Sequence, residues 1–126
     1  MRALLLILIV SSALGCRSKE DVVRVGVKSF TEQKVVGQMM ATLLAGTGKQ
    51  VSIVPCGNTF TCQEGLRAAE IDVMVDYTGT GLQYVGGPAA DIENPLGQLD
   101  ALYEPMGLKW PFELGFDNRY IVVVPT

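Results

Sequence analysis

The chain has 126 residues and a mass of 13.6 kDa, which suffices for one ordinary domain. Its formal net charge of −3 provides no electrostatic attraction for nucleic acid, so nucleic acid is not an expected partner. The sequence has no histidine, which removes the commonest general base and the commonest metal ligand. We therefore expect a protein that is not an enzyme and that has no metal site or other cofactor.

The first segment is typical of a signal peptide. After Arg2, residues 3–10 form an unbroken apolar run that is too short for a stable membrane-spanning helix. Small residues then lead to Cys16, which resembles the acylated cysteine of bacterial lipoproteins, although Ala13 stands where leucine is usual. We expect residues 1–15 to be a lipoprotein-type signal peptide, Cys16 to be lipidated and residues 16–23 to be a polar tether. An ordinary signal peptide with a coincidental cysteine is the alternative.

Four short runs rich in β-branched residues predict strands. They are residues 22–27, 51–54, 71–75 and 120–124. Helix patterns separate the first three, and this alternation predicts an α/β domain with a mainly parallel sheet and helices on its faces. Ligands of such sheets bind beyond the carboxyl ends of the strands, where residues 28–31, 58–61 and 77–80 lie.

Two capping boxes predict where helices begin, since Ser29 precedes Glu32 by three residues and Thr61 precedes Glu64 by three. The first helix should end at Gly46 and Gly48. Its apolar stripe should consist of pairs four residues apart, namely Val35, Val36, Met39, Met40, Leu43 and Leu44. Later in the chain, we expect an exit loop at residues 76–81, a longer loop at 86–97 and a helix candidate at 99–106.

If Cys16 is lipidated, two cysteines remain. In an oxidising compartment this even remainder predicts a disulfide between Cys56 and Cys62. Five residues separate the two, whereas a redox-active pair has two, so a structural bond is expected.

Three motifs of the chain resemble segments of one family. They are residues 25–33 (VGVKSFTEQ), residues 70–82 (EIDVMVDYTGTGL) and residues 114–120 (LGFDNRY). They resemble, in this order, the opening strand with Phe-Thr-Glu-Gln, the Ile-Asp strand with its Tyr-Thr-Gly-Thr loop, and the segment before the domain crossover of the ABC-transporter proteins that bind glycine betaine, choline and proline betaine. The resemblance implies a type II periplasmic-binding fold, in which two α/β lobes hold ligand between them. Residues 24–126 would form the N-terminal part of that fold, which is then incomplete through truncation, a split gene or fragmentation.

The resemblance also implies ligand-binding roles for Lys28, Tyr77, Thr80 and Tyr120. A trimethylammonium group has no hydrogen to donate, so the aromatic faces of Tyr77 and Tyr120 would bind it through cation–π contacts. Lys28 and the Thr80 hydroxyl would bind the carboxylate of a betaine. Each residue has a structural alternative: Lys28 as a solvated loop lysine, Thr80 as a helix cap, and the two tyrosines as packing residues.

The acidic residues near this site are expected to have other roles. Glu32 is assigned to helix capping, because it would repel a betaine carboxylate. Asp72 and Asp76 lie four residues apart on one face of a strand, where solvated or loop-capping roles are expected. Asp117 stands where the family usually has asparagine, so choline is a candidate ligand beside glycine betaine. No site role is predicted for Tyr84, Tyr103 and Trp110.

The resemblance implies the substrate-binding component of an ABC importer for glycine betaine, choline or related quaternary ammonium osmolytes. Its partners would be the permease subunits, the ATPase and, through a lipid anchor, the periplasmic or extracellular face of the cytoplasmic membrane. A sensory or non-functional single lobe that needs a second polypeptide is the alternative. A chain with half of the aromatic cage is expected to bind such ligands at millimolar affinity or weaker.

Overall fold

The computed structural model of the chain describes residues 22–87 and 93–117, together with residues 123 and 125. Within them, three parallel strands form a sheet in the order β2–β1–β3. Strand β1 (Val22–Lys28) is central and pairs with β2 (Gln50–Gly57) and with the short β3 (Val73–Met74). The predicted α/β class and parallel sheet are confirmed. The signal peptide, Cys16 and most of the predicted tether and last strand lie outside the described residues.

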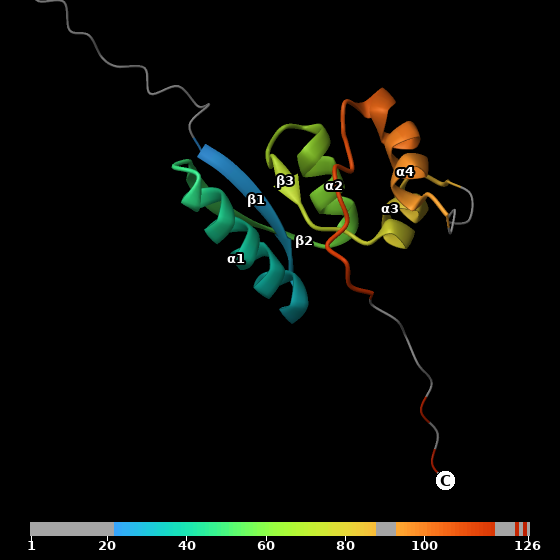
Figure 1. Ribbon diagram of the computed structural model, residues 1–126, viewed down its shortest axis with the longest axis horizontal. Coiled ribbons are helices and arrows are strands. Elements are labelled where there is room, and N and C mark those ends of the chain that lie inside the picture. Colours follow the sequence, from blue (N-terminus) through green and yellow to red (C-terminus); the bar gives the residue numbers. More distant parts are fainter. Residues whose placement is uncertain (1–21, 88–92, 118–122, 124, 126) are drawn as a thin grey trace, which may run out of the picture.

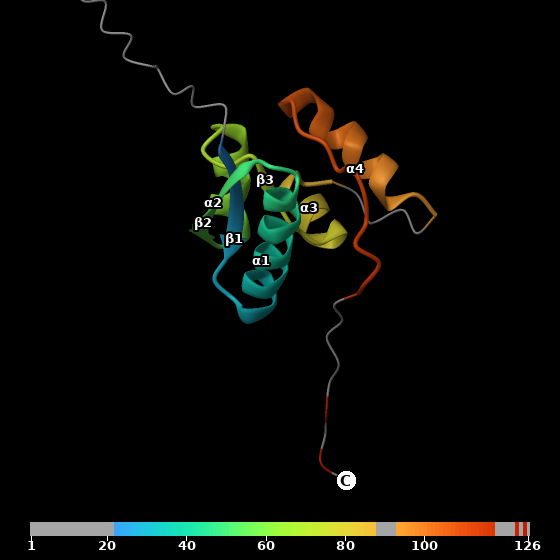
Figure 2. The same cartoon turned by 60° about the vertical axis from the view of Figure 1, so that its left-hand side comes forward.

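Helices α1 (Thr31–Gly46) and α2 (Thr59–Arg67) lie on opposite faces of the sheet (Figure 1). Three shorter elements follow, which are α3 (Thr78–Tyr84), α4 (Pro95–Tyr103) and the 3₁₀ turn η2 (Glu104–Met106). Figures 1 and 2 show α3 and α4 together on one side of the sheet. In the part of the chain that the structure describes, no helix is long and apolar enough to cross a membrane.

The two faces of β1 serve different purposes, because successive side chains of a strand point to opposite faces. Val25 and Val27 are buried against Ala41 of α1 and form the first hydrophobic core. Gly37 of α1 allows this close packing, since a Cβ there would lie 2.4 Å from a methyl carbon of Val27. The opposite face of β1 carries Lys28 at its carboxyl end and looks towards α2.

A second hydrophobic core joins α3 to α4. It is formed by Leu82, Leu99 and Tyr103, with Trp110 packed against it. The buried Tyr103 hydroxyl donates a 3.0 Å hydrogen bond to the carbonyl oxygen of Gly81. This core holds α3 in place directly after the loop that leaves β3.

Both helix starts predicted from capping boxes are wrong. Helix α1 begins at Thr31, after Phe30 in an extended conformation, and no side chain caps it. Helix α2 begins at Thr59, and its cap is Asn58, whose side chain accepts a 3.0 Å hydrogen bond from the Thr61 backbone N–H.

Three further predictions need correction. The expected exit loop is largely α3, which places Thr80 inside a helix and not at its cap. Helix α4 begins at Pro95, within the range expected to be loop, and its predicted continuation to Met106 is the turn η2. The apolar stripe of α1 is only half used: Met40 and Leu44 pack on the core. Val35, Met39 and Leu43, the first residue of each predicted pair, are exposed.

The disulfide lies where β2 meets α2. The structure joins Cys56, near the end of β2, to Cys62 in the first turns of α2, with 5.0 Å between their Cα atoms. The Cys62 side chain is completely buried. The bond therefore fastens the start of α2, and with it the next residue, Gln63, to the edge strand of the sheet.

Candidate ligand-binding site

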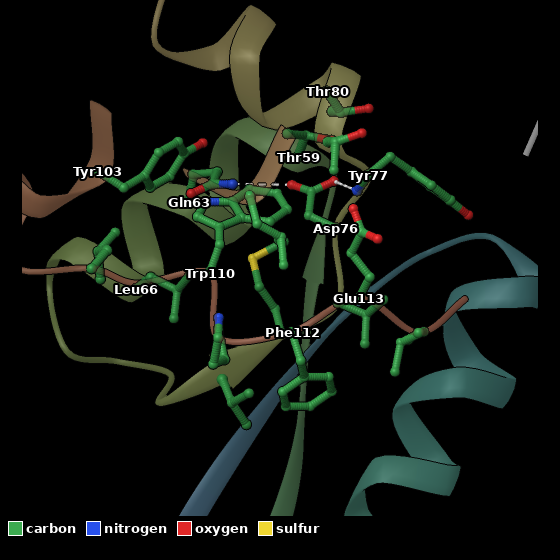
Figure 3. Close-up of a pocket in the computed structure, with 18 of the residues that line it drawn as sticks. Thr59, Gln63, Leu66, Asp76, Tyr77, Thr80, Tyr103, Trp110, Phe112 and Glu113 are labelled. Carbon is green, nitrogen blue, oxygen red and sulfur yellow. Dashed lines mark hydrogen bonds between the residues drawn. The ribbon is translucent and has the colours of Figure 1, made fainter. Parts of the chain in front are cut away.

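An open cavity of about 1240 Å³ lies beyond the carboxyl ends of β1 and β3. Its wall is formed by the end of β1, helix α2, the loop after β3, helix α3 and residues 107–117 (Figure 3). This is the place where a parallel sheet brings together residues that are distant in sequence. Of the four residues predicted to bind ligand, Lys28, Tyr77 and Thr80 line the cavity, and Tyr120 lies outside the described residues.

Lys28 is buried and not the solvated loop lysine of the alternative interpretation. Its ammonium group forms an ion pair with Asp76 Oδ1, and the two side chains are only 2% and 3% exposed. The geometry follows from the parallel register, in which Gly26 pairs with Met74, so that Lys28 is level with Asp76. The positive charge of Lys28, which was predicted to bind a ligand carboxylate, is thus already balanced by Asp76.

Asp76 is the centre of the polar network, and the prediction of a solvated role for it is wrong. Besides Lys28, its Oδ1 accepts a 2.8 Å hydrogen bond from the Tyr77 backbone N–H, and its Oδ2 accepts a 3.0 Å hydrogen bond from Gln63 Nε2. An ionised carboxylate only accepts hydrogen bonds, so the amide nitrogen of Gln63 must be the group that points at it. Among the described residues, the buried Gln63 Oε1 has no hydrogen-bond partner.

Tyr77 is held from two directions. The Lys28 ammonium lies 5.7 Å from the centroid of its ring, within cation–π distance. Its hydroxyl donates a hydrogen bond to Glu32 Oε1 at the start of α1. The assignment of Glu32 to helix capping is therefore wrong, because its carboxylate instead anchors a tyrosine that follows β3. The ring is thus positioned by the end of the central strand and by the first turn of α1.

Thr80 reaches the cavity from α3 and lies near Asp76 and Tyr77 in Figure 3. The same figure shows Trp110, Phe112 and Glu113 carried by the irregular segment that follows η2. Sequence reasoning found no site role for Trp110, because neither strand nor helix periodicity marks that segment.

The position of Trp110 is set by the second core. Its ring meets that of Tyr103 edge-on, with 5.5 Å between the centroids. Its backbone N–H donates a 2.7 Å hydrogen bond to Asp100 Oδ1 of α4. Burial raises the pKa of the Tyr103 hydroxyl, which therefore remains a neutral donor to Gly81. An aromatic wall is thus built by α4 and the segment after it.

A second ion pair, between Asp72 and Arg24, lies at the other end of β3. Asp72 accepts hydrogen bonds from Arg24 Nε at 2.9 Å, from the Arg24 terminal nitrogen at 2.7 Å and from the Arg24 backbone N–H at 2.7 Å. The side-chain hydrogen bonds from Arg24 hold the pKa of Asp72 below its usual value. This pair is one-third exposed, so its charges are screened by water, whereas those of the Lys28–Asp76 pair are not.

The site combines aromatic surface with hydrogen-bond donors and acidic groups. Six charged residues line the cavity, namely Lys28, Lys109, Asp72, Asp76, Glu113 and Asp117. Within the described residues, no cluster of three or more cysteine, aspartate or glutamate side chains could hold a metal ion. The arrangement suits a small organic cation, which aromatic faces and nearby carboxylates attract.

Comparison with known proteins finds a matching family and a distant relative. The model of a family described as the substrate-binding domain of ABC-type glycine betaine transport systems matches residues 21–126. The glycine-betaine-binding protein of Pseudomonas aeruginosa is 24% identical over 110 residues, which are 86% of this chain and 35% of that protein. The chain thus spans about a third of the length of this relative. No solved structure matches the chain. Because the match covers residues 21–126, the protein belongs to the family of substrate-binding domains of ABC-type glycine betaine transport systems.

Proposed function

We propose that this chain binds small quaternary ammonium compounds, such as glycine betaine or choline, for an ABC importer. Membership of the family supports a substrate-binding role in quaternary ammonium transport. The observation that carries the proposal is the juxtaposition of Lys28 and Tyr77, with 5.7 Å between the ammonium and the ring centroid, in a cavity at the strand ends. An aromatic ring and a buried donor within one ligand's length fit a molecule with a cationic head and a polar tail.

The proposed orientation places the trimethylammonium group against the Tyr77 ring, on the side that Lys28 does not occupy. Thr80 and the remaining N–H groups of Lys28 offer donors to the polar end of the ligand. Tyr120 is proposed as a second cage residue. Each cation–π contact contributes about 0.5–1 kcal/mol when exposed and about 2 kcal/mol when desolvated.

The rest of the transport assembly is also part of the proposal. The chain would form one lobe of a type II periplasmic-binding fold and present ligand to permease subunits driven by an ATPase. Cys16 would carry the lipid that keeps it at the outer face of the cytoplasmic membrane. A ligand held between two lobes needs a second wall. Trp110 and Phe112 of this chain provide only part of such a wall.

The test is a titration of the chain with glycine betaine and with choline, followed by NMR so that millimolar affinities are measurable. Binding should perturb the resonances of Tyr77 and Trp110, which line the cavity. Ethanolamine, the primary-amine counterpart of choline without its methyl groups, is the control and should perturb them far less. Equal effects of all three compounds would contradict a quaternary ammonium site.

A further inference from the structure

We propose that Asp76 is a specificity-determining residue, which biases the site towards quaternary ammonium compounds without a carboxylate. The inference rests on the proposed function and goes further, since it ranks ligands within the proposed class. It follows from the ion pair between Lys28 and Asp76 at the floor of the cavity. By pairing with Lys28, Asp76 removes the net positive charge that a betaine carboxylate would otherwise meet.

Asp76 is fixed in its place before any ligand arrives. Three donors from three segments point at its two oxygens. The donors are Lys28 Nζ of β1, Gln63 Nε2 of α2 and the backbone N–H of Tyr77 in the loop after β3. The carboxylate is 3% exposed, so water neither competes for it nor screens it effectively. It therefore acts as an oriented carboxylate, paired with the lysine, before a ligand binds.

A carboxylate ligand meets two unfavourable effects at this site. If it shares Lys28 with Asp76, two carboxylates lie close together in a poorly solvated place, and like charges there repel strongly. If it displaces Asp76, the protein is left with a buried carboxylate that has lost its cation. Glu32, bound to the Tyr77 hydroxyl, adds a further negative charge on the other side of the ring.

A cation without a carboxylate meets neither effect. The ammonium of Lys28 lies near the Tyr77 ring and alone would repel a second cation there. Because Asp76 balances that ammonium, and Glu32 lies beyond the ring, the local field favours a cation. Glycine betaine and choline share the trimethylammonium head and differ in the tail, a carboxylate in one and a hydroxyl in the other, so their affinity ratio isolates this effect.

The experiment measures that ratio by NMR titration of the wild-type chain, Asp76→Asn and Glu64→Gln. Wild type should bind choline more tightly than glycine betaine by about tenfold or more. In Asp76→Asn the side-chain oxygen still accepts from the Tyr77 N–H, and its amide nitrogen can donate to Gln63 Oε1 once the Gln63 amide turns over. Lys28 loses its counter-ion, so the ratio should shift towards glycine betaine by about tenfold or more. Glu64→Gln removes the same charge from the exposed pair of Glu64 with Arg67 and should leave the ratio unchanged, because Glu64 does not line the cavity.

The outcomes separate the inference from the proposed function. Equal or tighter binding of glycine betaine by wild type overturns the inference alone, and needs no variant. An unchanged ratio in a folded Asp76→Asn protein, checked by far-UV circular dichroism, also overturns it, because a purely structural role would weaken both ligands equally. If neither ligand perturbs the Tyr77 and Trp110 resonances even at the highest concentration that dissolves, the proposed function itself is wrong, and the inference falls with it.

Discussion

The hydroxyl of Tyr77 donates a hydrogen bond to the carboxylate of Glu32, which joins the segment after β3 to the first turn of α1. The bond orients the ring, while the ring face makes the proposed contact with a cation. Tyr77→Ala should therefore weaken binding of choline by about 1–2 kcal/mol, the range of a desolvated cation–π contact. Tyr77→Phe keeps the face and should cost clearly less. Titrations of both variants decide the matter, and equal losses would mean that the hydroxyl and not the ring is needed.

The Lys28–Asp76 pair should show strong thermodynamic coupling. Lys28→Met strands a buried carboxylate and Asp76→Asn strands a buried ammonium, and each should lower the free energy of unfolding by about 3–5 kcal/mol. The double variant removes both charges and should lose much less than the sum of the two. Urea denaturation of the four proteins measures the coupling. Additive losses would show that the two groups do not depend on each other.

The Arg24–Asp72 pair should make stability depend on pH in the acid range. The folded pKa of Asp72 is lowered by Arg24, so its contribution is present above the unfolded pKa of about 3.9 and is lost as the pH falls through the folded value. Asp72→Asn should therefore destabilise the protein slightly at neutral pH, as expected of an exposed pair, and the difference should vanish in strong acid. Urea curves over a pH series provide the check, and a difference that stays constant with pH would contradict the assignment.

Two glycines of α3 should respond in opposite ways to alanine. A Cβ at Gly81 would lie 2.4 Å from Trp110 Cζ2 and 3.1 Å from Leu99 Cδ2, so Gly81→Ala should overpack the second core and cost about 1–3 kcal/mol. A Cβ at Gly79 would meet nothing within 4 Å, and Gly79→Ala should stabilise the helix by up to about 1 kcal/mol. Thermal unfolding and Trp110 fluorescence compare the two variants. If the two variants are equally stable, Trp110 does not pack against α3.

The disulfide should contribute mainly to stability. In the loop-closure description, a bridge between Cys56 and Cys62 stabilises the fold by roughly 2–3 kcal/mol, because it closes a short loop. Replacing both cysteines with alanine should lower the free energy of unfolding by that amount in urea titrations. Peptide mapping without reductant should find the two cysteines linked in wild type. Thiols at both positions that react freely with an alkylating agent would refute the bond.

The sequence predicts the alternation of strands and helices well, because that signal is local. It fails at the two helix starts, because of distant partners at α1 and because of a nearby cap residue at α2. At Ser29 the capping pattern is complete, but the Ser29 N–H bonds to the carbonyl of Gly57 and prolongs the strand pairing. Glu32 is meanwhile bound by Tyr77, 45 residues away. At α2 a better cap residue, Asn58, stands three positions before Thr61 and takes the role.

The sequence predicts the residues that line the cavity better than the residues that support them. Lys28, Tyr77 and Thr80 all line the cavity, because motifs at strand ends indicate where ligand-facing loops lie. The burial of Asp76 could not be predicted, since it depends on which strand becomes the neighbour of β1 and in what alignment. No site role is predicted for Trp110 for a related reason. Its position is set by contacts with Tyr103 and Asp100, and by no local sequence pattern.

The two ion pairs between β1 and the β3 segment also bear on how the sheet assembles. Only Val73 and Met74 of β3 pair with β1, so backbone hydrogen bonds alone discriminate poorly between possible alignments. A slip by one residue would turn Asp76 to the opposite face and leave the Lys28 ammonium buried without a counter-ion, and it would break the Arg24–Asp72 pair at the same time. Misaligned sheets are thus penalised at both ends of a very short strand. The Lys28–Asp76 pair, which is proposed to determine ligand preference, thus also favours the alignment of β3 that forms this cavity.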